Sequence, residues 1–156
     1  MSLVRLVPKR DPNAVIDRKW LVFFGDAEGE PWWARLLEPG YRHVAACAWF
    51  DDQQRWVYFN PTRRGTVILL YRDDEFGGRF QQMVNSSSCV LRVIATQSRT
   101  STPFGWWCTG GIKALLGVRC RALSVRGLRD HLLRHGAEVV QMPGSEPERH
   151  DEPVQA

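Results

Sequence analysis

The chain has 156 residues, of which 44% are hydrophobic and 24% charged, and these values fit one globular domain with its own core. No apolar run approaches the ~20 residues that a membrane-spanning helix needs, and the N-terminus lacks the apolar stretch of a signal peptide. We therefore expect a protein that either remains in the cytosol in which it is made or is delivered by something other than a signal of its own.

The net charge of +4 is unevenly distributed. Residues 142–156 hold four acids and one arginine, a net charge of −3, so residues 1–141 carry +7. A basic body of this kind can contact nucleic acid or another anionic surface. The arginines are scattered rather than clustered, which favours a solvated basic surface over a nucleic-acid interface.

Residues 1–17 are charged, contain proline and show no periodicity, which indicates an extended basic arm before a single domain at 18–141. Apolar or alternating runs predict strands at 18–25, 41–50, 55–60, 65–72 and 89–96, with a short further candidate at 137–142. The run at 41–50 is apolar on both faces, which is typical of a central strand, and residues 51–54 form the turn to the next strand.

Four helices are expected between and after these strands. One spans 31–37 and opens on Pro31, and a second spans 73–87 with Asp73 or Asp74 as its cap. The third spans 108–116, and the last runs from Ser124 to a stop at Gly136. The fold class is therefore α+β, an antiparallel sheet of four to five strands packed against about four helices, followed by a disordered acidic tail at 142–156.

Four cysteines are present, and no two of them have CxxC spacing: Cys47, Cys89, Cys108 and Cys120. Without a secretory context, we do not expect a disulfide framework. The spacings also match no zinc-finger or zinc-ribbon pattern that would include His43, so we expect neither a metal nor a cofactor.

Cys108 opens the third expected helix, in the stretch WWCTGGIKALLG. The free N–H groups and the positive dipole end of a helix start stabilise a thiolate, and they can also bind an oxyanion. Cys108 is therefore a candidate nucleophile rather than only a buried core residue. The residues around it would form the substrate pocket or the oxyanion site: Trp106, Trp107, Thr109 and Gly110.

Two glycines, Gly110 and Gly111, occupy the first turn of this helix although glycine costs up to ~1 kcal/mol against alanine there. Either a substrate approaches the backbone closely at this point, or the helix packs closely on the sheet. The sequence leaves both interpretations open.

His43 is the candidate base, and Asn60 is the candidate residue that orients it. A two-residue turn in the hairpin places His43 opposite Asn60, whereas a four-residue turn places it opposite Thr62 with Asn60 as its diagonal neighbour. Either register puts the two side chains on one face and within reach of each other. A His–Asn pair in which the amide fixes the ring tautomer is a familiar partner set for a cysteine nucleophile.

The other histidines are weaker candidates. His131 and His135 are four residues apart on the last expected helix, and His150 lies in the tail. The spacing of the first two would suit a metal, but no carboxylate ligand pattern accompanies them, so a solvated helix face is the better interpretation.

The order His43 at a strand start, Asn60 at the end of the next strand and Cys108 at a helix start resembles the circularly permuted branch of the papain-like NlpC superfamily, which includes lecithin:retinol acyltransferase-like enzymes. The segments PWWARLLEPGYRHVAACAW and WWCTGGIKALLGV are also similar to small tailed-bacteriophage proteins, some described as internal core proteins. The resemblance covers roughly residues 18–135.

The resemblance implies a papain-like fold and hydrolysis or transfer at an amide or ester, often in peptidoglycan peptides or lipids. Carried over to this chain, Cys108 would be the nucleophile, His43 the general base and Asn60 the orienting residue. The CTGG sequence departs from a more ordinary helix start after the cysteine.

Two functions lead from the sequence, and nucleic-acid binding through the basic body ranks behind both. The protein is either a cysteine hydrolase or acyltransferase of phage origin, or a non-catalytic virion component that uses the same fold. Its partners would be a peptidoglycan peptide or related amide or ester in the first case, and other virion proteins in the second. In both cases we expect it in the host cytoplasm, with packaging into the virion in the second.

Overall fold

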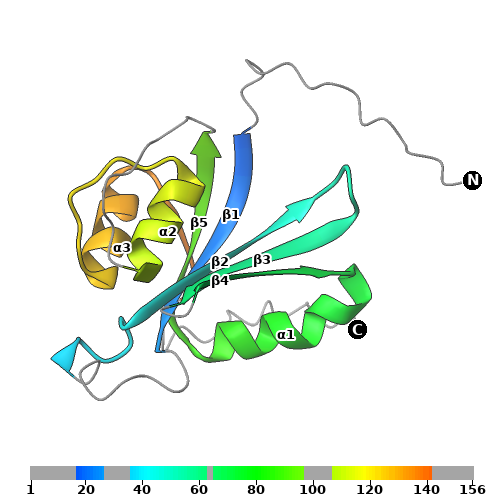
Figure 1. The fold of residues 1–156 in the computed structure, drawn as a ribbon, viewed down its shortest axis with the longest axis horizontal. Helices are drawn as coiled ribbons and strands as arrows, with labels where there is room; N and C mark the ends of the chain where they lie inside the picture. The colour runs from blue at the N-terminus through cyan, green and yellow to red at the C-terminus, as the bar shows by residue number, and fades with distance from the viewer. Residues whose placement is uncertain (1–16, 27–35, 63–64, 97–106, 142–156) are drawn as a thin grey trace, which may run out of the picture.

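A computed structural model describes residues 17–26, 36–62, 65–96 and 107–141 of the chain (Figure 1). Six strands form one antiparallel sheet in the order β4-β3-β2-β1-β5-β6. The strands are β1 (Asp17–Gly25), β2 (His43–Phe50), β3 (Arg55–Thr62), β4 (Gly65–Tyr71), β5 (Ser87–Thr96) and β6 (Glu138–Gln141). The helices are α1 (Asp73–Asn85), α2 (Trp107–Leu116) and α3 (Val125–Arg134).

The expected α+β class and antiparallel sheet are confirmed, but the numbers of elements differ. The described residues form six strands and three helices. The short run at 138–141 does pair with β5 and adds the sixth strand. Most of the helix expected at 31–37 lies outside the described residues, as do the arm at 1–16 and the tail at 142–156.

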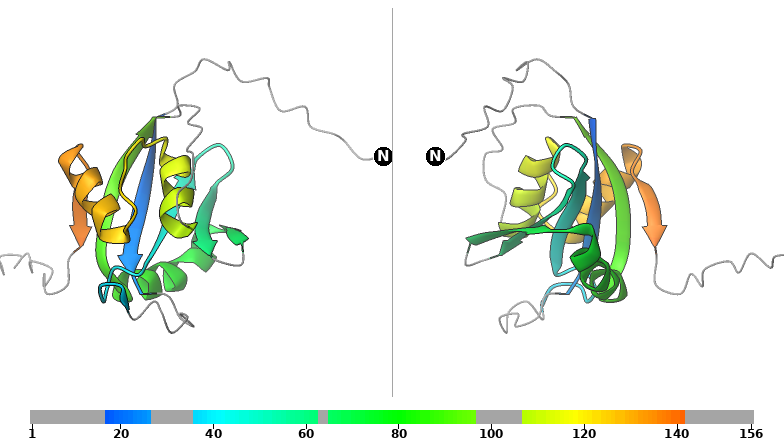
Figure 2. Two further views of the ribbon diagram at one scale, coloured as in Figure 1. Left: turned by 60° about the vertical axis from the view of Figure 1, so that its left-hand side comes forward. Right: turned by 90° about the vertical axis from the view of Figure 1, so that its right-hand side faces the viewer.

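The helices lie on both faces of the sheet, with α2 and α3 on one face and α1 on the other (Figure 2). One core cluster fills the space under α2 and α3, and a smaller cluster lies under α1. Alternate residues of β2 enter the two clusters, since Val44 and Ala46 belong to the first and Ala45 and Cys47 to the second. This double burial explains why the run at 41–50 is apolar on both faces.

The hairpin between β2 and β3 turns through residues 51–54, and Phe50 pairs with Arg55. Gln54 closes this turn in the left-handed region, with φ of 51°. The pairing continues to Ala46 opposite Phe59, which is the four-residue-turn register of the two that the sequence allowed. This register makes Asn60 the diagonal neighbour of His43.

The start of α1 differs from the expected cap at Asp73 or Asp74. Arg72 takes the cap position, and its backbone N–H donates to the carboxylate of Glu75 at 3.2 Å. The two aspartates instead occupy the first turn, where their negative charges interact favourably with the positive end of the helix dipole. The cap at Ser124 is confirmed, because its hydroxyl accepts from the N–H of Gly127 at 3.0 Å.

Candidate functional site

The structure brings His43 and Asn60 into direct contact. His43 is the first residue of β2, Asn60 lies near the end of β3, and both side chains are partly buried. The imidazole Nε2 lies 2.6 Å from Asn60 Oδ1, which is hydrogen-bond distance. The antiparallel hairpin thus joins two polar side chains that are 17 residues apart in the chain.

This hydrogen bond decides which ring nitrogen can act as a base. With Asn60 Oδ1 as the acceptor, Nε2 carries the proton of the neutral imidazole and donates it to the bond. The lone pair of His43 is then on Nδ1, so Nδ1 is the atom that would take a proton from a thiol. This arrangement is the one that an orienting amide provides for a cysteine nucleophile.

Cys108 is the second residue of α2, and only 9% of its side chain is exposed. One turn later, a Cβ placed on Gly111 would lie 2.7 Å from the Cβ of Pro61, the residue that follows Asn60. Cys108 also shares its core cluster with Val44, the residue that follows His43. The helix that carries the thiol therefore packs on the immediate chain neighbours of the His43–Asn60 pair.

The alternation of side chains along the strands limits how the thiol and the imidazole can meet. Val44 and Pro61 face α2, so regular alternation directs His43 and Asn60 toward the face that carries α1. His43 is, however, the first residue of β2 and so lies at an end of this strand. A contact between Nδ1 and the Cys108 sulfur would therefore have to run around the end of β2 and not through the sheet.

Of the other residues that the sequence placed in the site, the structure describes the side chain of Thr109 and the position of Gly110. Thr109 is buried, and its hydroxyl donates to the Leu123 carbonyl at 3.4 Å, so it ties α2 to the segment before α3. Gly110 is buried in the first turn of α2, where helix N–H groups lack partners within the helix. Trp106 and the side chain of Trp107 lie outside the described residues.

The sequence did not identify what Gly111 packs against. The close approach of its Cα to the ring of Pro61 favours the helix-packing interpretation of this glycine over the substrate interpretation. Two features of the sequence pointed to this contact: a glycine in the expected helix, Gly111, and a proline after the candidate asparagine, Pro61.

Cys47 and Cys89 are buried thiols in the sheet. Burial raises the pKa of Cys47 from its ordinary value of 9.0 to about 12, and burial also raises the pKa of Cys89. A raised pKa keeps a thiol protonated and unreactive, so neither residue competes with Cys108 as a candidate nucleophile.

The raised pKa of Cys47 predicts a loss of stability at high pH. The folded protein holds this proton more tightly than the unfolded chain, so the contribution is fully present below pH 9 and is lost as the pH rises toward 12. We expect urea unfolding to show a free energy of unfolding that falls across this range. The fall should be shallower in Cys47→Ala, by up to about 1.4 kcal/mol per pH unit. Equal slopes in the two proteins would contradict the assignment.

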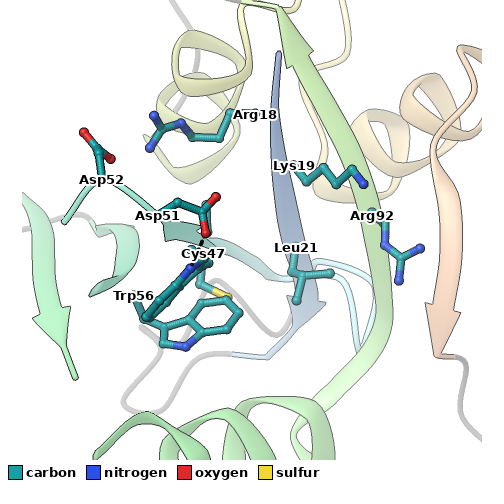
Figure 3. A pocket seen from close by; sticks show the side chains of 10 residues that line it. Arg18, Lys19, Leu21, Cys47, Asp51, Asp52, Trp56 and Arg92 are labelled. Carbon is teal, nitrogen blue, oxygen red and sulfur yellow. Dashed lines mark hydrogen bonds between the residues drawn. The ribbon is translucent and has the colours of Figure 1, made fainter. Parts of the chain in front are cut away.

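An open depression of about 630 Å³ lies on the sheet, and neither His43 nor Asn60 is among its lining residues. Figure 3 shows the side chains that line it. Its charged lining contains both signs, with Lys19 and Arg92 on neighbouring strands and Asp51 and Asp52 in the hairpin turn. The aromatic part is Trp49 and Trp56, whose ring centroids are 5.6 Å apart. None of the candidate catalytic residues lines it, so it does not extend the candidate site.

His131 lies in α3 and His135 is the C-cap of that helix. Their ring centroids are 4.0 Å apart with the planes tilted by 31°, and His135 Nδ1 is 2.8 Å from the His131 carbonyl. Burial lowers the pKa of His131, with the neighbouring His135 as a smaller cause. Across the described residues, no three histidine, cysteine or acidic side chains gather as metal ligands. No helix in the same residues has the length and hydropathy to cross a membrane.

Comparison with family models, curated proteins and solved structures gives no match for this chain.

Proposed function

We propose that this protein is a papain-like thiol hydrolase of phage origin, acting on an amide or ester bond such as those of peptidoglycan peptides. The observation that carries the proposal is the 2.6 Å hydrogen bond between His43 Nε2 and Asn60 Oδ1. This bond orients the imidazole of His43. Helix α2, which carries Cys108, packs near Val44 and Pro61, the residues that follow His43 and Asn60 in the chain.

In the proposed reaction, His43 Nδ1 takes the thiol proton of Cys108, and the sulfur attacks the substrate carbonyl carbon. The negative oxygen of the tetrahedral intermediate is stabilised by N–H groups at the start of α2. The imidazolium then gives its proton to the leaving amine or alcohol, which leaves an acyl-thioester. Water, deprotonated by His43, releases the acid and restores the thiol.

The second candidate function is that of a non-catalytic virion protein that retains this fold. The observation that favours it is the alternation of β2 and β3, which directs His43 and Asn60 away from the face that α2 covers. In that case the thiol is a core residue, and the hydrogen bond only closes the end of the hairpin.

Alkylation of the thiols across a range of pH separates the two functions. Iodoacetamide is applied to the whole protein from pH 5 to 10, and each modified cysteine is quantified by mass spectrometry. The hydrolase requires that the rate at Cys108 follows a pKa below about 8, under the ~8.5 of a free thiol. Partly exposed Cys120 is the internal reference. A Cys108 profile that inflects at or above that of Cys120 would exclude the hydrolase.

A further inference from the structure

Strand β4 forms one edge of the sheet, with β3 on one side and no described strand on the other (Figures 1 and 2). Four consecutive residues of β4 are large, apolar and exposed: Val67, Ile68, Leu69 and Leu70. The alternating pattern puts two of these side chains on each face of the sheet. The outer backbone groups of such an edge are a template for pairing with another strand.

The sequence of β4 itself contains none of the residues that normally protect a sheet edge. Between Gly65 and Tyr71 there is no charged residue and no proline, and the strand is seven residues long. The opposite edge is different, because β6 has only four residues and begins with Glu138, whose carboxylate accepts from Arg92 at 3.0 Å. Long, apolar and uncharged edges are the ones that associate.

We propose that β4 pairs with β4 of a second copy of this chain, antiparallel and edge to edge, to make one continuous sheet across a two-fold dimer. The flanking sequence favours a second copy in this orientation. Two arginines precede the strand, whereas Arg72 is followed by three acids at positions 73–75. Antiparallel pairing sets the basic end of each strand against the acidic end of the other, and parallel pairing would set like charges together.

The proposed pairing also stops at a dimer, because it leaves no β4 edge for a third copy. A two-fold contact uses the same strand from both copies, so it occupies both apolar edges and leaves only the short, charged β6 edges outside. It extends the antiparallel pattern of the sheet without moving β3. The inference is independent of the proposed hydrolase function, because none of the candidate catalytic residues is in β4.

The dimer is tested on the full chain by sedimentation equilibrium over a range of concentrations. We expect wild-type protein to dimerise and Ile68→Lys to raise the dissociation constant at least tenfold, because its two lysines would meet near the two-fold axis. Leu70→Lys is a second variant with the same expected direction. Ile94→Lys is the matched control, since Ile94 is an isoleucine of the same sheet with 62% exposure against 58% for Ile68.

Amide hydrogen exchange then locates the contact. Amides of β4 should exchange more slowly at high than at low protein concentration in the wild type and in Ile94→Lys, and this difference should vanish in Ile68→Lys. A wild-type chain that stays monomeric at about 100 μM, roughly the range of weak association, would overturn the proposal. Equal dissociation constants for the Ile68 and Ile94 variants would overturn it too.

Discussion

Replacing His43 with alanine is expected to reduce hydrolysis of an activated ester and of peptidoglycan peptides by about 10²–10⁴-fold in kcat/KM, the range for loss of a general base. The reason lies in the hydrogen bond at 2.6 Å, which leaves Nδ1 as the proton-accepting atom of the imidazole. Steady-state hydrolysis with the purified full chain measures the effect, and Cys108→Ala should lower the rate at least as far.

The same experiment needs variants that separate chemistry from folding. Asn60→Ala removes only the partner of Nε2, so we expect a smaller loss, about tenfold, with a shifted pH profile. His135→Ala is the histidine control, because His135 is exposed and its ring contacts His131, one turn earlier in the chain. If His43→Ala and His135→Ala have equal activities, and Cys108→Ala keeps the wild-type rate, the hydrolase is excluded.

The proximity of His43 and Asn60 could be predicted from the sequence because it requires only that both side chains lie on the same face of the hairpin. An antiparallel hairpin without a bulge keeps both residues on one face for either turn length that the sequence allowed. The register itself could not be chosen, because Asp51, Asp52 and the two glutamines after them suit both turns. The structure selects the longer turn, in which Gln54 takes a left-handed φ of 51°.

Other features depend on contacts between distant segments, and the sequence gives little information about these. The sequence offered β6 as a strand candidate but did not identify its partner, which is β5 around Leu91, some fifty positions earlier. The placement of Cys108 relative to His43 has the same origin, since it is set by how α2 lies on the strands rather than by spacing along the chain.

That placement depends on Gly111, and Gly111→Ala should destabilise the protein by about 1–2 kcal/mol. Alanine is a better helix former than glycine by up to ~1 kcal/mol, which would stabilise α2 if there were room. The new Cβ, however, would lie 2.7 Å from the Cβ of Pro61 and 3.0 Å from its Cγ. The proline ring is fixed to the backbone of β3 and cannot rotate away, so α2 has to move, and overpacking of this kind costs about 1–3 kcal/mol.

Gly77→Ala is the matched control, because Gly77 is also helical but nothing lies within 4 Å of the Cβ that it would gain. The same substitution should therefore stabilise α1 by up to about 1 kcal/mol, and urea unfolding of the two variants should give shifts of opposite sign. Since α2 carries Cys108, its displacement should also slow alkylation of that thiol in Gly111→Ala and leave it unchanged in Gly77→Ala. Stabilisation by both substitutions would show that α2 does not rest on Pro61, and the thiol would then need another support to face His43.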